Sequence, residues 1–206
     1  MRIIEPSIEI LTEIDGDKIL KCIEKAARTC YKSEDKITED CESAKKIIKI
    51  LLDNHHEAMI EFDDITVKII TDIGAQRDLS RHRHISMACE STRYCSYNKN
   101  KFGNELTFIK PINIIDENEY KIWSNTMQFI ENSYLELSEL NCKPDQKRML
   151  LPLSTKTEFC MKANIREWRH ILKLRTSNAA HPSVQQVMKM VLKEFKEKIP
   201  VLFDDI

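Results

Sequence analysis

Residues 81–94 read RHRHISMACESTRY, which places three arginines, two histidines and two serines within one short stretch. The chain as a whole is nearly neutral, with 32 lysines and arginines against 33 aspartates and glutamates. Clustered guanidinium groups repel one another, and each offers a planar fork of donors that matches the oxygens of a phosphate. The stretch therefore predicts a local anion-binding site.

The neighbouring sequence contains too few acids to neutralise this cluster. Between residues 74 and 106 the acids are Asp78, Glu90 and Glu105, and the arginines at positions 77, 81, 83 and 93 outnumber them. A surface patch of salt bridges is the alternative interpretation, but it lacks enough local partners. An external anion is the better explanation of the cluster.

Composition narrows the class of protein. The even charge balance argues against a general nucleic-acid-binding protein. No segment approaches the ~20 consecutive apolar residues that cross a bilayer, and residues 1–15 lack the basic start and apolar core of a secretory signal. We therefore expect a cytoplasmic protein without a membrane partner. A chain of 206 residues buries roughly 70% of its unfolded surface, so one domain over residues 1–206 is expected.

Glycine and cysteine exclude several kinds of binding site. The three glycines, Gly16, Gly74 and Gly103, are too far apart for a G-x-G-x-x-G or Walker A loop. Side chains must then supply the donors for any bound nucleotide. The seven cysteines form no C-x-x-C pair, and Ile60 stands where a zincin motif beginning at His56 needs its second histidine. We expect free thiols and no metal.

Hydrophobic periodicity and turn residues predict one α+β domain. Strands are expected over 2–11, 62–70 and 106–110. Helices are expected over 18–32, from an N-cap at Thr38 through Leu51, over 73–83, over 117–140, from Pro144, over 164–175 and from Pro182 to Pro200. The helix over 73–83 would bring the arginine stretch to a helix end.

The pattern Arg-His-Arg, then Ser91 after seven residues, then Arg93-Tyr94, resembles the signature of the flavin-dependent thymidylate synthases. Three further blocks are similar to that family: HHEAMIE at 55–61, RMLLP at 148–152, and NIREWRH at 164–170 with the Leu-Arg and Ala-Ala-His-Pro segments that follow it. The resemblance implies a single α+β domain with a small, mostly antiparallel sheet packed against several long helices. It also implies FAD-dependent methylation of dUMP to dTMP, with methylene-tetrahydrofolate and NADPH as co-substrates. The family is a homotetramer whose active sites are shared between subunits.

The resemblance also assigns candidate site residues. FAD would contact His56, Glu61, Arg81, His82, Arg83, Asn164, Arg166 and His170. The nucleotide would contact Asp78, Arg81, Glu90, Ser91, Arg93, Arg148 and Arg175. Arg175, which would stabilise negative charge on the uracil ring, and His56 would be the catalytic residues. Taken singly, these blocks also fit a solvated turn histidine, a helix-end arginine and a helix with a basic outer face.

Two positions depart from the family pattern. Ala88-Cys89 stands where the family has Asn-Glu, and Phe62 replaces a second histidine. The first departure leaves open another pyrimidine deoxynucleotide chemistry, such as hydroxymethylation. A catalytically silent flavin- or nucleotide-binding protein is a further alternative. A thiol-dependent synthase using Cys89 or Cys95 is disfavoured, because the arginine signature belongs to a different family.

Overall fold

The computed structural model describes residues 1–95, 97 and 104–206. The strands are β1 (Arg2–Ile4), β2 (Ser7–Ile10), β3 (Asp64–Asp72), β4 (Ile85–Cys89), β5 (Thr107–Ile109) and β6 (Lys156–Asn164). The helices are α1 (Gly16–Tyr31), α2 (Glu42–Asp53), α3 (Ile73–Leu79), α4 (Glu117–Glu139), α5 (Pro144–Lys147), α6 (Ile165–Arg175), α7 (Pro182–Lys198) and α8 (Pro200–Phe203). Three 3₁₀ turns are η1 (Glu34–Lys36), η2 (Glu57–Glu61) and η4 (Arg148–Leu150).

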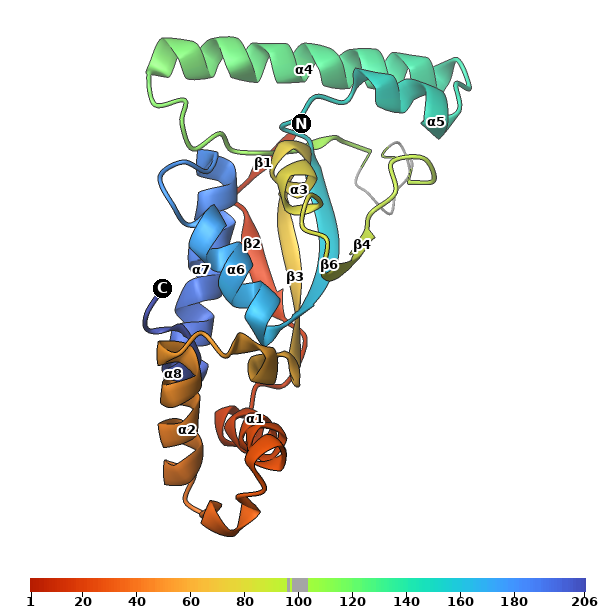
Figure 1. The fold of residues 1–206 in the computed structure, drawn as a ribbon. Helices are drawn as coiled ribbons and strands as arrows, with labels where there is room; N and C mark the ends of the chain where they lie inside the picture. The colour runs from red at the N-terminus through yellow and green to blue at the C-terminus, as the bar shows by residue number, and fades with distance from the viewer. Residues whose placement is uncertain (96, 98–103) are drawn as a thin grey trace.

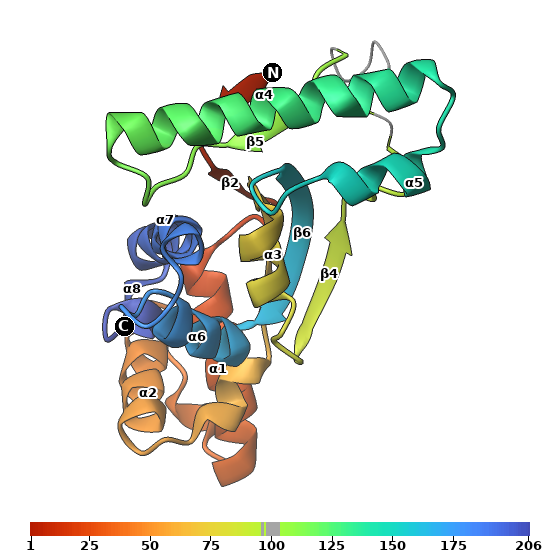
Figure 2. The same ribbon diagram turned by 90° about the horizontal axis from the view of Figure 1, so that it is seen from above.

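A four-stranded sheet in the order β2-β3-β6-β4 forms the centre of the molecule, and each neighbouring pair in it is antiparallel. A separate parallel pair joins β1 to β5. Helices α6 and α7 lie against one side of the sheet, α4 crosses one end of the molecule, and α1 and α2 lie at the other end (Figures 1 and 2). The predicted α+β fold with a small, mostly antiparallel sheet is confirmed.

Two strands of the sheet, β4 and β6, were not predicted from periodicity. In β6 the residues on one face are buried, including Phe159, Met161 and Ala163, while Lys156 and Lys162 lie on the other face. Lysine and glutamate are depleted in strands, so the composition of this segment did not indicate a strand. The longest ladder of the sheet, nine pairs between β3 and β6, nevertheless depends on this segment.

Two element boundaries also differ from the predictions. The strand predicted over 2–11 is two strands in different sheets. Pro6 lies between β1 and β2 and has no backbone N–H to donate, so the strand is interrupted there. Helix α2 begins at Glu42, so Thr38 is not its N-cap. The Thr38 hydroxyl still accepts a hydrogen bond from the backbone N–H of Ser43 at 3.2 Å, which ties the preceding loop to the first turn.

The core lies between the sheet and helices α6 and α7. Trp168 of α6 is fully buried, donates through Nε1 to the carbonyl of Ile65 at 2.9 Å, and packs edge-on against Phe195 with ring centroids 5.4 Å apart. Removing a buried aromatic side chain of this kind costs about 3–5 kcal/mol. Trp168 therefore fixes α6 on β3, and the polar residues of α6 are held in place by this packing.

The junction of β6 and α6 is a single residue. Asn164 ends the strand and is the N-cap of the helix, because its Oδ1 accepts from the backbone N–H of Glu167 at 2.8 Å. The first turn of α6 thus begins where β6 ends, beside the segment that leads into β4. Among the described residues, no helix is both long and apolar enough to cross a membrane.

Candidate functional site

A buried histidine links the arginine stretch to both ends of α6. His82 is 8% exposed, and its Nε2 accepts a hydrogen bond from Nε of Arg175 at 3.0 Å. Its Nδ1 lies 3.5 Å from Oε1 of Glu167, in the first turn of the same helix. Nη2 of Arg175 also donates to the backbone carbonyl of Asp78 at 2.9 Å. The two segments are therefore locked together by polar contacts in addition to packing.

The environment of His82 keeps its imidazole neutral. Burial, followed by the nearby Arg175 and His170, lowers the pKa of His82 from 6.5 to about 4. Because an arginine N–H can only donate, Nε2 must be the acceptor, and the neutral ring carries its proton on Nδ1. That proton points towards Glu167.

This tautomer bears on a possible metal site. His82, Glu167 and His170 have ligand atoms within 4.8 Å of one another. A metal needs an unprotonated ring nitrogen from each histidine, but Nε2 of His82 accepts from Arg175 and its Nδ1 carries the ring proton. The protonation of His82 thus argues against a metal centre, and we call His82, Glu167 and His170 together with Arg175 the wall.

On one side of this wall is a pocket of about 460 Å³, lined by Glu61, His84, Asn164, Arg166, Glu167 and His170. Nη1 of Arg166 lies 2.6 Å from Oε1 of Glu61, and its Nε lies 3.6 Å from Glu57. This pairing, led by Glu61, raises the pKa of Arg166 above its usual range. An anionic ligand here would have to share Arg166 with these carboxylates.

The structure brings four of the residues expected at FAD into this pocket: Glu61, Asn164, Arg166 and His170. Arg83 lines a smaller pocket of about 290 Å³ alongside, which shares His84 and Asn164 with the first. His56 is the exposed residue just before η2 and does not line either pocket. His82 lies behind the pocket wall rather than on its surface.

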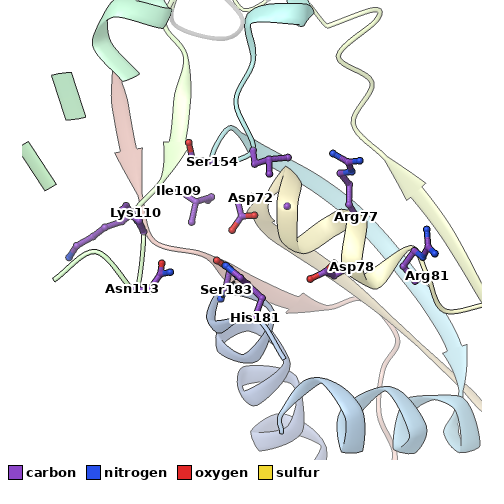
Figure 3. A pocket seen from close by; sticks show the side chains of 13 residues that line it. Asp72, Arg77, Asp78, Arg81, Ile109, Lys110, Asn113, Ser154, His181 and Ser183 are labelled. Carbon is purple, nitrogen blue, oxygen red and sulfur yellow. Dashed lines mark hydrogen bonds between the residues drawn. The ribbon is translucent and has the colours of Figure 1, made fainter. Parts of the chain in front are cut away.

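A second pocket, of about 550 Å³, opens near α3 (Figure 3). Its lining includes two of the residues expected at the nucleotide, Asp78 and Arg81, and three basic residues that were not predicted, Arg77, Lys110 and His181. Arg77 is four residues before Arg81, a helical spacing that could have indicated it from sequence. Lys110 and His181 come from segments far apart in the chain, and no local pattern signals their meeting.

The remaining nucleotide candidates lie away from these pockets. Ser91 and the exposed Arg93 are in the turn after β4, where the Arg93 guanidinium lies 5.5 Å from the ring centroid of Tyr94. Arg148 is exposed in η4. None of the three is among the residues that line the pockets of about 550 and 460 Å³.

Glu90 is held by its own chain. Its carboxylate lies 2.8 Å from Nζ of Lys156 and accepts from the Tyr97 hydroxyl at 3.1 Å, and its backbone N–H donates to Glu158 at 2.8 Å. The hydroxyl of Tyr97 is correspondingly harder to ionise, since burial and the Glu90 carboxylate raise its pKa. The pairing with β6 thus fixes the register of β4, so Glu90 does not take the place of Cys89.

Cys89 has none of the surroundings of a reactive thiol. Its Sγ accepts from Nε2 of Gln76 at 3.4 Å, and burial raises its pKa. A nucleophilic cysteine instead needs a depressed pKa and nearby cations. The geometry therefore argues against covalent catalysis by Cys89.

Comparison with known proteins gives a consistent result. A family model described as thymidylate synthase complementing protein matches residues 13–201. A flavin-dependent thymidylate synthase of Thermosipho melanesiensis is 30% identical over 194 residues, covering 87% of this chain and 82% of the relative. Another, from Corynebacterium aurimucosum, is 28% identical over 196 residues, covering 89% and 78%.

Two solved structures share the fold. The UMP/dUMP methylase PolB from Streptomyces cacaoi, bound with 5-Br dUMP, has a TM-score of 0.82 at 21% identity and covers 99% of this chain and 96% of its own. Thymidylate synthase X from Helicobacter pylori, with FAD and dUMP, has a TM-score of 0.77 at 24% identity and covers 97% and 98%. At these identities the likeness concerns the fold.

Proposed function

The chain belongs to the thymidylate synthase complementing protein family, whose members are flavin-dependent thymidylate synthases, and we propose that it methylates dUMP to dTMP. The proposed co-substrates are methylene-tetrahydrofolate and NADPH, with FAD as cofactor. The observation that carries the proposal is the position of Arg175 between the two pockets, although it lines neither. Arg175 donates to the carbonyl of Asp78, which lines one pocket, and to His82, which lies beside Glu167 of the pocket that contains the expected flavin residues.

The donor set of the first pocket fits FAD. A flavin dinucleotide carries two phosphates, and the described chain offers no glycine-rich loop for them, so cationic side chains must bind them. Arg166 and Asn164 line the pocket, and Arg83 lies in the adjoining one. We assign FAD contacts to these residues together with Arg81, Glu61, His56 and His170, whereas the buried His82, which lines neither pocket, is left out of this set. When bound, the flavin supplies the hydride that reduces the transferred one-carbon unit.

Arg175 is suited to contact the pyrimidine ring. Of its five N–H donors, Nε and one on Nη2 are used within the chain, which leaves three. A fixed guanidinium can stabilise negative charge that develops on the ring, an effect worth roughly 3–4 kcal/mol at preorganised sites. The protein's own part is to orient and polarise the ring.

The nucleotide phosphate would be anchored by Ser91, Arg93 and Arg148. These residues line neither the flavin pocket nor the pocket near α3, and the two arginines are exposed to solvent. We therefore propose that copies of the chain complete each site, as in a homotetramer. The seven free cysteines fit the reducing conditions of the cytoplasm, where we place the reaction.

A second candidate substrate is a different pyrimidine nucleotide. The specific observation is Cys89, which cannot supply the hydrogen bonds of the glutamate it replaces, while Glu90 is engaged with Lys156 and Tyr97. A product assay with dUMP and dCMP, each with labelled methylene-tetrahydrofolate, separates the two. Label in dTMP supports the main proposal, and label in a dCMP product with none in dTMP contradicts it.

The flavin assignment has its own test. We expect the purified protein to carry FAD absorbance and the double variant Arg83→Ala with Arg166→Ala to lose it while keeping its circular dichroism. A matched control replaces the exposed Lys189 and Lys193 of α7, which removes two positive charges elsewhere. Full FAD binding by the arginine double variant would overturn the assignment of these residues.

A further inference from the structure

The guanidinium of Arg175 is held along one edge only. Nε and Nη2, which form that edge, donate to Nε2 of His82 at 3.0 Å and to the carbonyl of Asp78 at 2.9 Å. Two attachment points on a planar group fix both its position and the orientation of its plane. The opposite edge, with Nη1 and the second N–H of Nη2, is the one left for a ligand.

His82 is in turn held by Glu167. Nδ1 of His82 lies 3.5 Å from the Glu167 carboxylate, and the side chains of both residues are largely buried, 5% and 11% exposed. Glu167 sits in the first turn of α6, and the backbone N–H of Glu167 is itself bonded to the Asn164 cap. The line of contacts Glu167, His82, Arg175 therefore begins at the strand–helix junction and ends at the last residue of α6.

We propose that His82 is a positioning residue: through the Glu167–His82–Arg175 line it presents the free edge of Arg175 to the carbonyl edge of a pyrimidine ring. The proposal rests on the proposed function for the identity of the ligand, and assigns His82 a role through Arg175 rather than through contact with FAD. A buried histidine stabilises the core no better than an apolar residue of similar size would, but its Nε2 gives Arg175 a fixed acceptor.

The protonation state of His82 is central to this role. A doubly protonated ring would turn Nε2 into a donor facing the Nε–H of Arg175, and the contact would be lost. The charged and titratable groups around the ring are Arg175, Glu167 and His170, all from α6. Burial and the nearby Arg175 keep the pKa of His82 near 4, so Nε2 is an acceptor throughout the neutral pH range.

The functional test is a double-mutant cycle on single-turnover flavin oxidation by the nucleotide. His82→Leu removes the acceptor, and His82→Gln keeps an oxygen near the place of Nε2. We expect His82→Leu to slow the step on the order of 10–100-fold, His82→Gln to recover most of that loss, and His82→Leu to add little when Arg175 is already alanine. An equal loss in both backgrounds, or no recovery with glutamine, would overturn the proposal.

A control variant, His55→Asn, removes a histidine outside the site. His55 is exposed and has φ of 56°, a conformation that asparagine tolerates. It should react like the unmodified protein.

A measurement on the unmodified protein does not depend on the variants folding. In protein labelled with ¹⁵N-histidine, His82 should be the neutral Nδ1–H tautomer and stay neutral on acidification to about pH 5. Assignment of His82 to the Nε2–H tautomer would overturn the geometry. If the tautomer is as expected but the unmodified protein shows no dUMP-dependent flavin oxidation, the proposed function fails and the geometry stands.

Discussion

Two sets of candidate residues differ in how the chain holds them. The wall residues His82 and Arg175 are partly or fully buried and hydrogen-bonded within the chain. The rim residues Arg93 and Arg148 are exposed, on a turn and a 3₁₀ segment. A preorganised group contributes mainly to the transition state, whereas an exposed cation contributes mainly to binding and is screened by salt. The wall should therefore control the rate of chemistry and the rim the affinity for nucleotide.

The sharpest test of this difference is Arg175→Ala. Loss of a preorganised electrostatic contact of roughly 3–4 kcal/mol corresponds to a slowing of about 100- to 1,000-fold in single-turnover flavin oxidation. Because a lysine has no planar fork, Arg175→Lys should recover only part of the loss. Full recovery by lysine would show that charge alone matters, and the two-point attachment to His82 and Asp78 would lose its significance.

At the rim, Arg148→Ala and Arg93→Ala should weaken nucleotide binding. Charge-assisted hydrogen bonds contribute about 1.5–3 kcal/mol each, so Kd for dUMP should rise on the order of 10- to 100-fold with little change in the chemical step at saturation. The effect should shrink as salt is added. Replacing the exposed Lys121 of α4 provides the control. A rate defect at saturating dUMP would place these arginines with the wall instead.

The two sets also differ in how well sequence could predict them. The helical periodicity of α6 is visible in the sequence, so this helix was predicted in its observed place. The burial of His82 was not, because Arg-His-Arg reads as uniformly polar, and its enclosure depends on Glu167 and Arg175 approaching from 85 or more residues away. Strand β6 was missed because the lysines and the glutamate on its outer face are residue types that are depleted in strands.

Acidification should lower the free energy of unfolding through His82 of the wall. The pKa of His82 is about 4 in the folded protein, below the unfolded value of 6.5. The unfolded state therefore binds the extra proton first, so the stability from neutral His82 is complete above about pH 6.5 and is lost as pH falls towards 4. At pH 5 the loss should be about 2 kcal/mol.

Urea unfolding at pH 7.5 and pH 5.0 measures this effect. The difference between the two pH values should be smaller in His82→Gln than in the unmodified protein, since glutamine does not titrate. Subtracting the two proteins cancels the contribution of the carboxylates, which both share. Equal differences would mean that His82 does not have a lowered pKa in the folded state.

The smallest effect is expected at Cys89, which lies beside the wall but belongs to neither set. It is the residue that most invites assignment as a nucleophile, because it lies among the three arginines of the signature. The raised pKa and the contact with Gln76 instead make it a small, weakly polar residue at the end of β4. Methyl transfer that relies on a flavin hydride needs no enzyme thiolate.

Cys89→Ala should therefore retain most of the single-turnover rate, a change of no more than a few-fold. Cys89→Glu, which restores the residue of the family pattern, should alter the Kd for nucleotide more than the rate at saturation, because a carboxylate at this position adds hydrogen-bonding capacity without changing Arg175. Nucleotide and FAD binding are measured alongside the rate in each variant. If Cys89→Ala binds both ligands and yet loses the chemical step completely, covalent catalysis returns as the mechanism, and the division between a catalytic wall and a binding rim would have to be redrawn around the thiol.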